Sequence, residues 1–270
     1  MSEVLFPEFG DWEPTRQTLH WYSKAVTAIP RAHAEAHPKW WHVSLKVVAD
    51  GLVSEKSALP DGRELWLKMD LVKHKAILYV DDDPLQEISL LDRLTSSEFA
   101  AVFLGTGAEL GLNGPFDRDK FENEDQRVYE PVEVEKFLAA LTNADRIFKE
   151  HKSALPGDTS PVQLWPHNFD LSVEWFGTRV EIFDDVEYPS QLNLGFYPGD
   201  TPYFYSNPWP FEKDVLLSTA LPPGATWHME GWEGTYLAYE ELAGEENAAE
   251  RLAEYAKIVF EITSPTLTKE

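Results

Sequence analysis

The sequence contains no cysteine among its 270 residues. This absence excludes disulfide bonds, thiolate metal sites, iron–sulfur clusters and cysteine nucleophiles together. Any metal site would have to use His, Asp and Glu. We predict none, because the eight histidines form no HExxH motif, and only His33 and His37 have the i, i+4 spacing, with Pro38 following and no clear acidic third ligand.

Basic residues are scarce. The chain has 23 Lys and Arg against 47 Asp and Glu, a formal net charge of −24. No cluster of Lys and Arg interrupts this surplus, so we expect neither a nucleic-acid partner nor an anionic membrane partner. The surplus is typical of a well-solvated surface that resists aggregation, and it could also attract a cationic ligand or a basic partner protein.

Long hydrophobic runs are also missing. No apolar stretch approaches the roughly 20 residues that cross a bilayer, and the first residues lack the basic and apolar regions of a secretory signal. The sequence therefore predicts a cytoplasmic protein. Nucleotide-binding P-loops, a GxGxxG turn after a strand and GxSxG nucleophile elbows are absent too, so no cofactor is predicted.

The chain has ample material for a hydrophobic core, with 43% hydrophobic and 13% aromatic residues. Helical periodicity predicts helices over about 14–30, from Thr95 or Ser96 onward, over 131–152 and over 245–262. Alternation of apolar and polar residues predicts the strands between them. The predicted strands are 40–48, 64–72, 75–81, 86–91, 161–166, 168–176, 179–183, 191–197, 203–207 and 226–240.

The order helix, several strands, helix occurs twice around a charged, aperiodic connector at 116–127. We therefore predict an α+β fold, a single compact domain over 1–270 whose two similar halves span about 1–115 and 128–270. A mixed or antiparallel sheet would be flanked by helices. The proline-rich and aromatic segment 198–225 is predicted as a long loop region.

Two segments, 39–48 and 164–175, combine tryptophan with histidine at the start of a predicted strand. In the first, His42 lies on the parity opposite Trp41, and in the second Asp170 lies opposite Phe169. These polar faces could line a concavity, in which His42 could titrate near neutral pH, or they could form an ordinary exposed sheet face. The sequence leaves both interpretations open.

Asp145 falls inside the apolar stripe of the predicted helix 131–152, between Leu138 and Leu141. An unpaired buried carboxylate would cost several kcal/mol, so Asp145 needs a partner. Lys149 at i+4, or an incoming His or Tyr, could serve. The carboxylate could tie the helix to a neighbouring segment, or it could act as an acid or base at the floor of a pocket.

Tryptophan and tyrosine are frequent, with ten of each. Flat rings stack on the apolar faces of sugars and aromatic ligands, while Asp and Asn bind hydroxyl groups. The same rings could equally fill the core and anchor loops. Their number alone does not separate these roles.

Several motifs together resemble an uncharacterised, mainly bacterial family known as a domain of unknown function. They extend over nearly the whole chain and include Thr18-Leu19-His20, Trp40-Trp41-His42-Val43 with Gly51-Leu52, Ala144-Asp145-Arg146-Ile147-Phe148-Lys149-Glu150, Ser160-Pro161-Val162, Phe169-Asp170-Leu171 and Gly195-Phe196-Tyr197-Pro198-Gly199.

The resemblance implies no activity, but it singles out a shared set of residues. The set is His20, Trp41, His42, Asp145, Arg146, Lys149, Phe169 and Asp170. The chain departs from the family's pattern at one place. Where a Ser-His-Glu element is expected before the Gly-Phe-Tyr-Pro-Gly motif, this sequence reads Tyr188-Pro189-Ser190-Gln191-Leu192-Asn193.

Our functional hypothesis is a protein that binds a small ligand in a cleft between the two halves, either as a binding protein or as an enzyme. If chemistry occurs, His42 and Asp145 are the predicted proton-transfer pair. The predicted ligand-binding residues are His20, Trp41, Lys149, His167 and Asp170. The alternative is a non-catalytic protein-interaction module that uses the acidic surface and an aromatic loop at 198–211, with Trp209 as an anchor.

Overall fold

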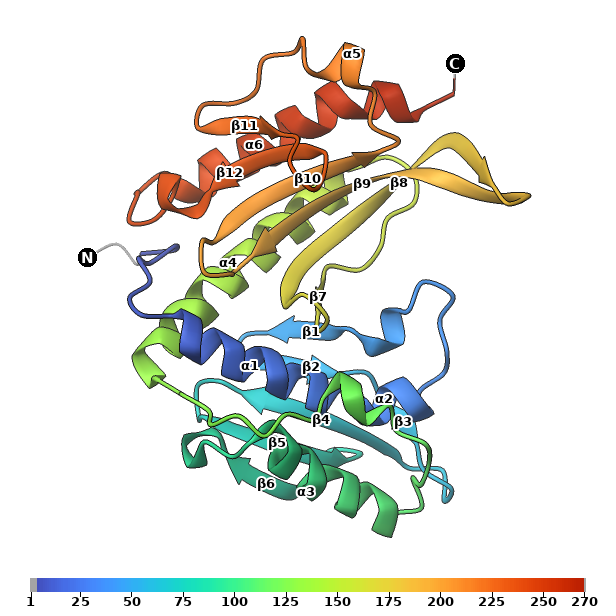
Figure 1. Cartoon of the computed structure of the whole chain (residues 1–270), viewed down its shortest axis with the longest axis vertical. Coiled ribbons are helices and arrows are strands. Elements are labelled where there is room, and N and C mark those ends of the chain that lie inside the picture. Colours follow the sequence, from blue (N-terminus) through green and yellow to red (C-terminus); the bar gives the residue numbers. More distant parts are fainter. Residues whose placement is uncertain (1–3, 270) are drawn as a thin grey trace. The chain divides into compact units, whose positions relative to one another are not determined.

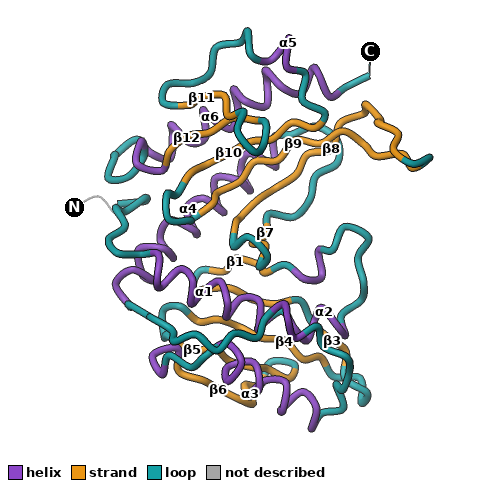
Figure 2. The backbone as a smooth tube through the Cα atoms, viewed as in Figure 1, coloured by secondary structure: helices purple, strands orange, loops and turns teal. Residues whose placement is uncertain are grey.

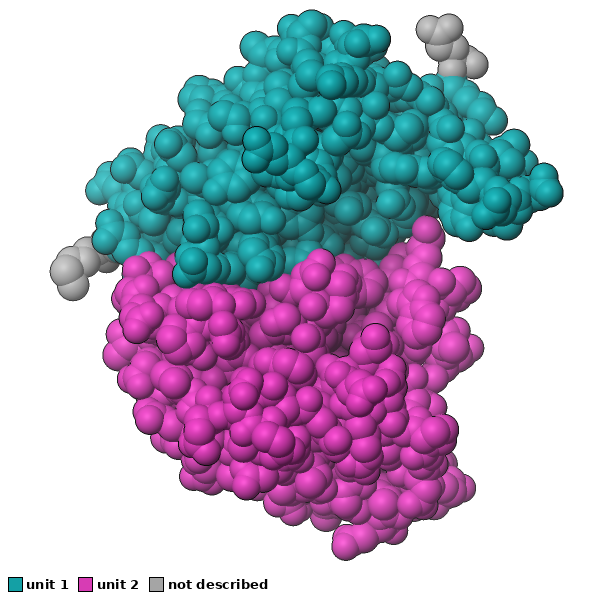
Figure 3. Space-filling view, in the orientation of Figure 1, with its two compact units in different colours: residues 1–8, 139–162, 170–270 teal, residues 9–138, 163–169 magenta. Residues whose placement is uncertain are grey.

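The computed structural model describes residues 4–269. The chain divides into two compact units, coloured separately in Figure 3. Unit 1 consists of residues 1–8, 139–162 and 170–270, and unit 2 of residues 9–138 and 163–169. Over the described part of the chain, no helix combines the length and the apolar character needed to cross a membrane.

Unit 2 is an antiparallel sheet with helices packed on it (Figure 1). Tyr22 of the first helix stacks on Phe99 of the third, with ring centroids 4.1 Å apart. The strands lie in the order β7-β1-β2-β4-β5-β6, with β3 beside β4. The elements are α1 (Glu13–Val26), α2 (Ala28–His33), β1 (Leu45–Val48), β2 (Gly51–Ser54), β3 (Ser57–Ala58), β4 (Glu64–Asp70), β5 (Lys75–Val80), β6 (Asp83–Ser89), α3 (Ser96–Glu109) and β7 (Gln163–Trp165).

Unit 1 has a second antiparallel arrangement of strands, in the order β8-β9-β10-β12-β11. Residues of α4 and α6 pack on one side of these strands, which we call the inner face. The opposite side is the outer face. The elements are α4 (Pro131–Ala154), whose residues up to Leu138 belong to unit 2, β8 (Asp170–Phe183), β9 (Val186–Tyr197), β10 (Tyr203–Trp209), α5 (Lys213–Leu216), β11 (Ala225–His228), β12 (Gly234–Ala238) and α6 (Ala248–Thr263).

The period-2 alternation of a strand decides which side chains of unit 1 reach each face. On β9, Leu192, Leu194 and Phe196 are buried against the helices. The alternate residues, including Gly195 and Tyr197, belong to the outer face. A polar and aromatic outer face therefore lies directly behind an apolar core.

Strands β8 and β9 continue beyond the rest of the sheet as a two-stranded arm, which we call the ribbon (residues 180–189; Figure 2). Its turn is formed by Asp184 and Asp185, whose φ angles are 49° and 62°. Two successive left-handed residues match the twist of a tight hairpin, and Asp tolerates this conformation better than most residues.

The structure confirms the predicted α+β class and the antiparallel sheets flanked by helices. It corrects several boundaries. The predicted helix 14–30 is two helices, because the chain breaks at Thr27, whose hydroxyl bonds the Ser23 carbonyl at 3.0 Å. Pro30 does not end the helix but lies within α2. The duplicated single-domain organisation stays a prediction.

Two further corrections affect the candidate site. The predicted strand 40–48 begins only at Leu45, because Trp40 has a φ of 59° and Trp41–Val43 form a 3-10 turn. The predicted aromatic loop 198–211 is wrong over half of its length, where the separately predicted strand 203–207 is confirmed. Tyr203–Trp209 form β10, which pairs with β9 and β12.

The start of α3 provides a test of local stability. Thr95 and Glu98 form a capping box, in which each side chain accepts a hydrogen bond from the other's backbone N–H, at 3.2 and 2.9 Å. We expect Thr95→Ala to lower the free energy of unfolding by about 1 kcal/mol, measured by urea denaturation. Thr106 lies in the same helix but does not cap it, so Thr106→Ala should change the free energy of unfolding by less than about 0.5 kcal/mol. Equal losses in the two variants would contradict the capping role.

Candidate functional site

The outer face of unit 1 is centred on a side-chain hydrogen bond between Tyr205 of β10 and Asp170 of β8. Tyr205 pairs with Gly195 of β9, and Gly195 pairs with Ser172 of β8. A Cβ at Gly195 would overlap the Tyr205 ring, so only glycine lets this ring lie flat across β9. The Tyr205 hydroxyl thereby reaches β8 and donates a hydrogen bond to Oδ2 of Asp170.

Burial raises the pKa of the Tyr205 hydroxyl well above 10, and the Asp170 carboxylate beside it acts in the same direction. The phenol therefore keeps its proton at neutral pH. It serves as a fixed hydrogen-bond donor rather than as a base. Asp170 is only 7% exposed, so this carboxylate depends on such donors.

Aromatic rings surround this bond on the outer face. Tyr203 lies next to Tyr236 of β12, with centroids 4.8 Å apart, and Trp232 stacks on His228 at 4.1 Å. All of these rings are half-buried, so each keeps part of its surface open to solvent. We call this group the aromatic face, and its members are Tyr197, Tyr203, Tyr205, His228, Trp232 and Tyr236.

Asn193 extends the polar part of the outer face. It lies two residues before Gly195 on β9 and pairs with Asn207 of β10. Its side-chain oxygen is buried and has no hydrogen-bond partner among the described residues. A buried acceptor of this kind is costly unless a donor reaches it.

Asp145 and Lys149 are paired, as their spacing predicts. Lys149 Nζ lies 2.6 Å from Oδ2 of Asp145, and Asp145 is 7% exposed. Burial raises the pKa of the Asp145 carboxyl, against the opposite effect of Lys149. Its second oxygen, Oδ1, is buried without a hydrogen-bond partner in the described part of the chain. The predicted burial and partner are confirmed, while a catalytic role for Asp145 stays a prediction.

His42 lies in a turn, not on the polar face of a strand as its parity predicts. Its Nδ1 accepts a hydrogen bond from the His37 backbone N–H at 3.2 Å, and the Trp40 ring stacks on it at 5.6 Å. Trp41 turns to stack on the His37 ring at 4.1 Å. Burial, followed by the charges of Arg31 and His37, lowers the pKa of His42.

His20 is held beside the 166–169 turn. Its Nε2 lies 3.1 Å from the carbonyl oxygen of His167, and its ring stacks on Phe169 at 5.6 Å. A carbonyl only accepts, so Nε2 carries the proton and Nδ1 remains an acceptor. His167 therefore contacts His20 through its own backbone carbonyl and not through its imidazole ring. The predicted strand 168–176 begins only at Asp170, because Phe169 has a left-handed φ of 61°.

The predicted site residues fall into two groups, one in each unit. Unit 2 holds His20, Trp41, His42 and His167, and it brings His20 and His167 together. Unit 1 holds Asp145, Lys149 and Asp170, and it brings the first two together. His42 and Asp145 belong to different units, so their proton transfer stays a prediction. Within residues 4–269, no three His, Asp or Glu side chains gather in a way that could hold a metal ion.

The comparison with protein families matches one family model over residues 6–268, and its description is a family of unknown function, DUF5996. The chain belongs to this family. No curated protein and no solved structure matches it.

The segment 195–199 contributes directly to the aromatic face. In Gly195-Phe196-Tyr197-Pro198-Gly199, the first glycine makes room for the Tyr205 ring. A Cβ at Gly199 would overlap the ring of Tyr197, so the second glycine makes room for another member. Sequence reasoning found this motif but missed Tyr203, Tyr205, Trp232 and Tyr236. The signal that could have found them is the alternation of Tyr203 and Tyr205 in a short strand next to Gly195.

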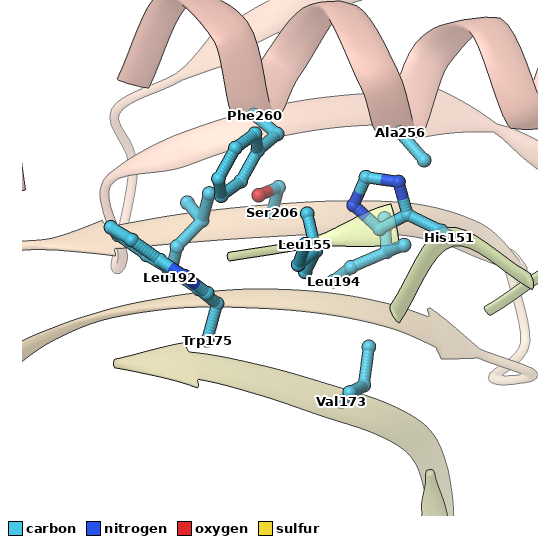
Figure 4. A pocket seen from close by; sticks show the side chains of 9 residues that line it. All are labelled: His151, Leu155, Val173, Trp175, Leu192, Leu194, Ser206, Ala256 and Phe260. Atoms are coloured by element: carbon cyan, nitrogen blue, oxygen red, sulfur yellow. The ribbon is translucent and has the colours of Figure 1, made fainter. Parts of the chain in front are cut away.

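A separate hollow in this DUF5996 protein lies on the inner face of unit 1, between α4, α6 and the strands (Figure 4). His151 is the titratable group in its lining, and burial lowers the pKa of this histidine to about 4. The remaining lining is mostly apolar, and the cavity has room for about one water molecule. The lining residues are His151, Leu155, Val173, Trp175, Leu192, Leu194, Ser206, Ala256 and Phe260.

The bond from Tyr205 to Asp170 gives a direct prediction. Tyr205→Phe removes the phenol donor from a buried carboxylate, so we expect a loss of roughly 1.5–3 kcal/mol in the free energy of unfolding. Tyr203→Phe in the same strand is the matched control and should cost less than about 0.5 kcal/mol. Urea denaturation of both variants compares them. A neutral Tyr205→Phe would show that the bond does not stabilise the fold.

His20 gives a prediction about pH. Burial, followed by the charges of Lys24 and Arg16, lowers its pKa from 6.5 to about 4. The unfolded chain then binds the proton more readily, so stability is complete above about pH 6.5 and falls as the pH drops towards about 4. We expect the free energy of unfolding to fall less steeply over this range in His20→Gln than in the wild type. Parallel pH profiles would contradict the shifted pKa, which NMR titration of the His20 ring measures independently.

Proposed function

We propose that the protein binds a small organic ligand on the outer face of unit 1. The observation that carries the proposal is the aromatic face, in which five half-buried rings surround the hydrogen bond from the sixth member, Tyr205, to Asp170. Rings with one open side can stack on a flat apolar ligand surface. The buried oxygen of Asn193 supplies an acceptor for a ligand donor group.

The charge distribution supports a neutral or cationic ligand. Between Arg179 and Arg251 the sequence has a single Lys, Lys213, and no Arg, and the intervening segment contains four of the strands of unit 1. A phosphate or carboxylate would find few cations there, and the net charge of −24 would repel it. Neutral sugars and organic amines meet these requirements, because they combine flat or apolar surfaces with hydroxyl or amino donors.

The proposal is one of binding and not of a defined reaction. The Tyr205 phenol, with its raised pKa, is a donor that keeps its proton. A catalytic function would need the predicted proton-transfer pair of His42 and Asp145, and that part of the hypothesis stays a prediction. A cytoplasmic location and the absence of a nucleic-acid partner belong to the same proposal, supported by the lack of cysteine and by the acidic composition.

A thermal-shift screen against neutral sugars, organic amines, phosphates and carboxylates tests the proposal. A ligand at 100 times its dissociation constant adds about 2.7 kcal/mol, which raises the unfolding temperature by a few degrees. We expect such a rise with sugars or amines and none with the anions. Trp232→Ala should abolish it, because this variant removes a stacking surface.

Trp66→Ala is the matched control for this screen. Trp66 is also half-buried and stacks on an aromatic ring, Tyr79, at 4.1 Å, but it belongs to unit 2. The ligand-induced rise should therefore persist in Trp66→Ala. A rise that survives Trp232→Ala, or one produced only by anions, would falsify the proposed site.

A further inference from the structure

The ribbon exposes an unusual concentration of large apolar side chains. Ile182, Phe183, Val186 and Tyr188 are 65%, 56%, 49% and 46% exposed, and all four lie within seven residues of one hairpin. Scattered exposed apolar residues are ordinary, but a contiguous group commonly marks an interaction surface.

The strand register and two ring contacts define where these side chains lie. Phe183 is opposite Val186 in the β8–β9 register, and its ring lies 6.4 Å from that of Tyr188 and 5.9 Å from that of Trp209. Ile182 points to the other face of the ribbon, since neighbouring strand residues alternate. Both faces of the ribbon therefore present an apolar side chain.

Acidic residues surround the apolar ones. Glu181, Asp184, Asp185 and Glu187 lie within the same segment. The nearest base in sequence, Arg179, forms ion pairs with Glu181, at 2.7 Å, and with Glu212. Any surface that covers the ribbon must consequently bring its own positive charge.

We propose that the ribbon is a docking arm for a polypeptide partner whose contact segment combines apolar side chains with Lys or Arg. Charge complementarity selects this occupant. A second copy of the chain would bring the same acids to the interface, and an anionic membrane would repel them. The inference is independent of the ligand site on the aromatic face, because it uses different residues of unit 1.

Selection from a phage-displayed library of random 12-residue peptides on the immobilised full chain tests the proposal. We expect the enriched peptides to combine aromatic or aliphatic residues with Lys or Arg. Their affinity should fall at least about tenfold for the double variant Ile182→Ser/Phe183→Ser, as for the loss of an interface anchor. Raising the salt concentration should also weaken binding, because exposed charges are screened.

Two variants serve as controls. Val72→Ser/Val132→Ser changes two valines of similar exposure, 59% and 62%, in unit 2 and should leave peptide binding unchanged. Asp184→Asn/Asp185→Asn keeps residues that tolerate the left-handed turn but removes two charges, so it should weaken binding and reduce its salt dependence. Equal thermal unfolding of all the variants confirms that they fold.

Several outcomes would overturn the proposal. Enriched peptides without basic residues would show that the acidic charge of the ribbon does not select the partner. Peptides that bind Ile182→Ser/Phe183→Ser as well as the wild type would show that the ribbon is not the binding surface. A wild-type dimer in sedimentation that dissociates in this variant would assign the ribbon to self-association. Binding to zwitterionic lipid vesicles that is lost in the variant, without any peptide binding, would assign it to a membrane surface.

Discussion

The Tyr205 ring lies flat on Gly195, and this close approach organises the outer face of unit 1. If a side chain stood at Gly195, the ring would have to rise, and its hydroxyl would no longer reach Asp170. The buried carboxylate would then lack its phenol donor, and the neighbouring rings would lose the flat member around which they group. The absence of a Cβ at Gly195 therefore allows one side chain to cross three strands, to bond a buried carboxylate and to form part of an aromatic surface. The same constraint explains why a glycine-containing motif belongs to the site although glycine performs no chemistry.

Features that depend on local sequence could be predicted. The burial of Asp145 and its pairing with Lys149 follow from helical geometry, which places both residues on neighbouring turns. The cap at Thr95 is also local, since it needs only Glu98 three residues later. The α+β class follows from the succession of helical and alternating patterns. For the ion pair and the cap, the determining neighbours lie within one helical turn or just beyond it.

Features that depend on register between strands could not be predicted. The contact from Tyr205 to Asp170 joins residues 35 apart and requires both the β8–β9 and the β9–β10 pairings. His42 was misplaced for another reason: the left-handed conformation of Trp40 leaves no trace in an alternating pattern. The second strand of the ribbon, at 186–189, was not predicted, because Pro189 normally argues against a strand. It is tolerated there because, among the described residues, this part of β9 pairs only with β8.

The ribbon also has a practical consequence, because its exposure coincides with the absence of cysteine. A single Cys placed at Glu187, near the tip, would be the only thiol in the sequence and would lie open to solvent. A fluorophore or spin label attached there would report from one defined position without any background from other residues. The composition that rules out thiol chemistry in the natural protein therefore makes this exposed hairpin a unique attachment point.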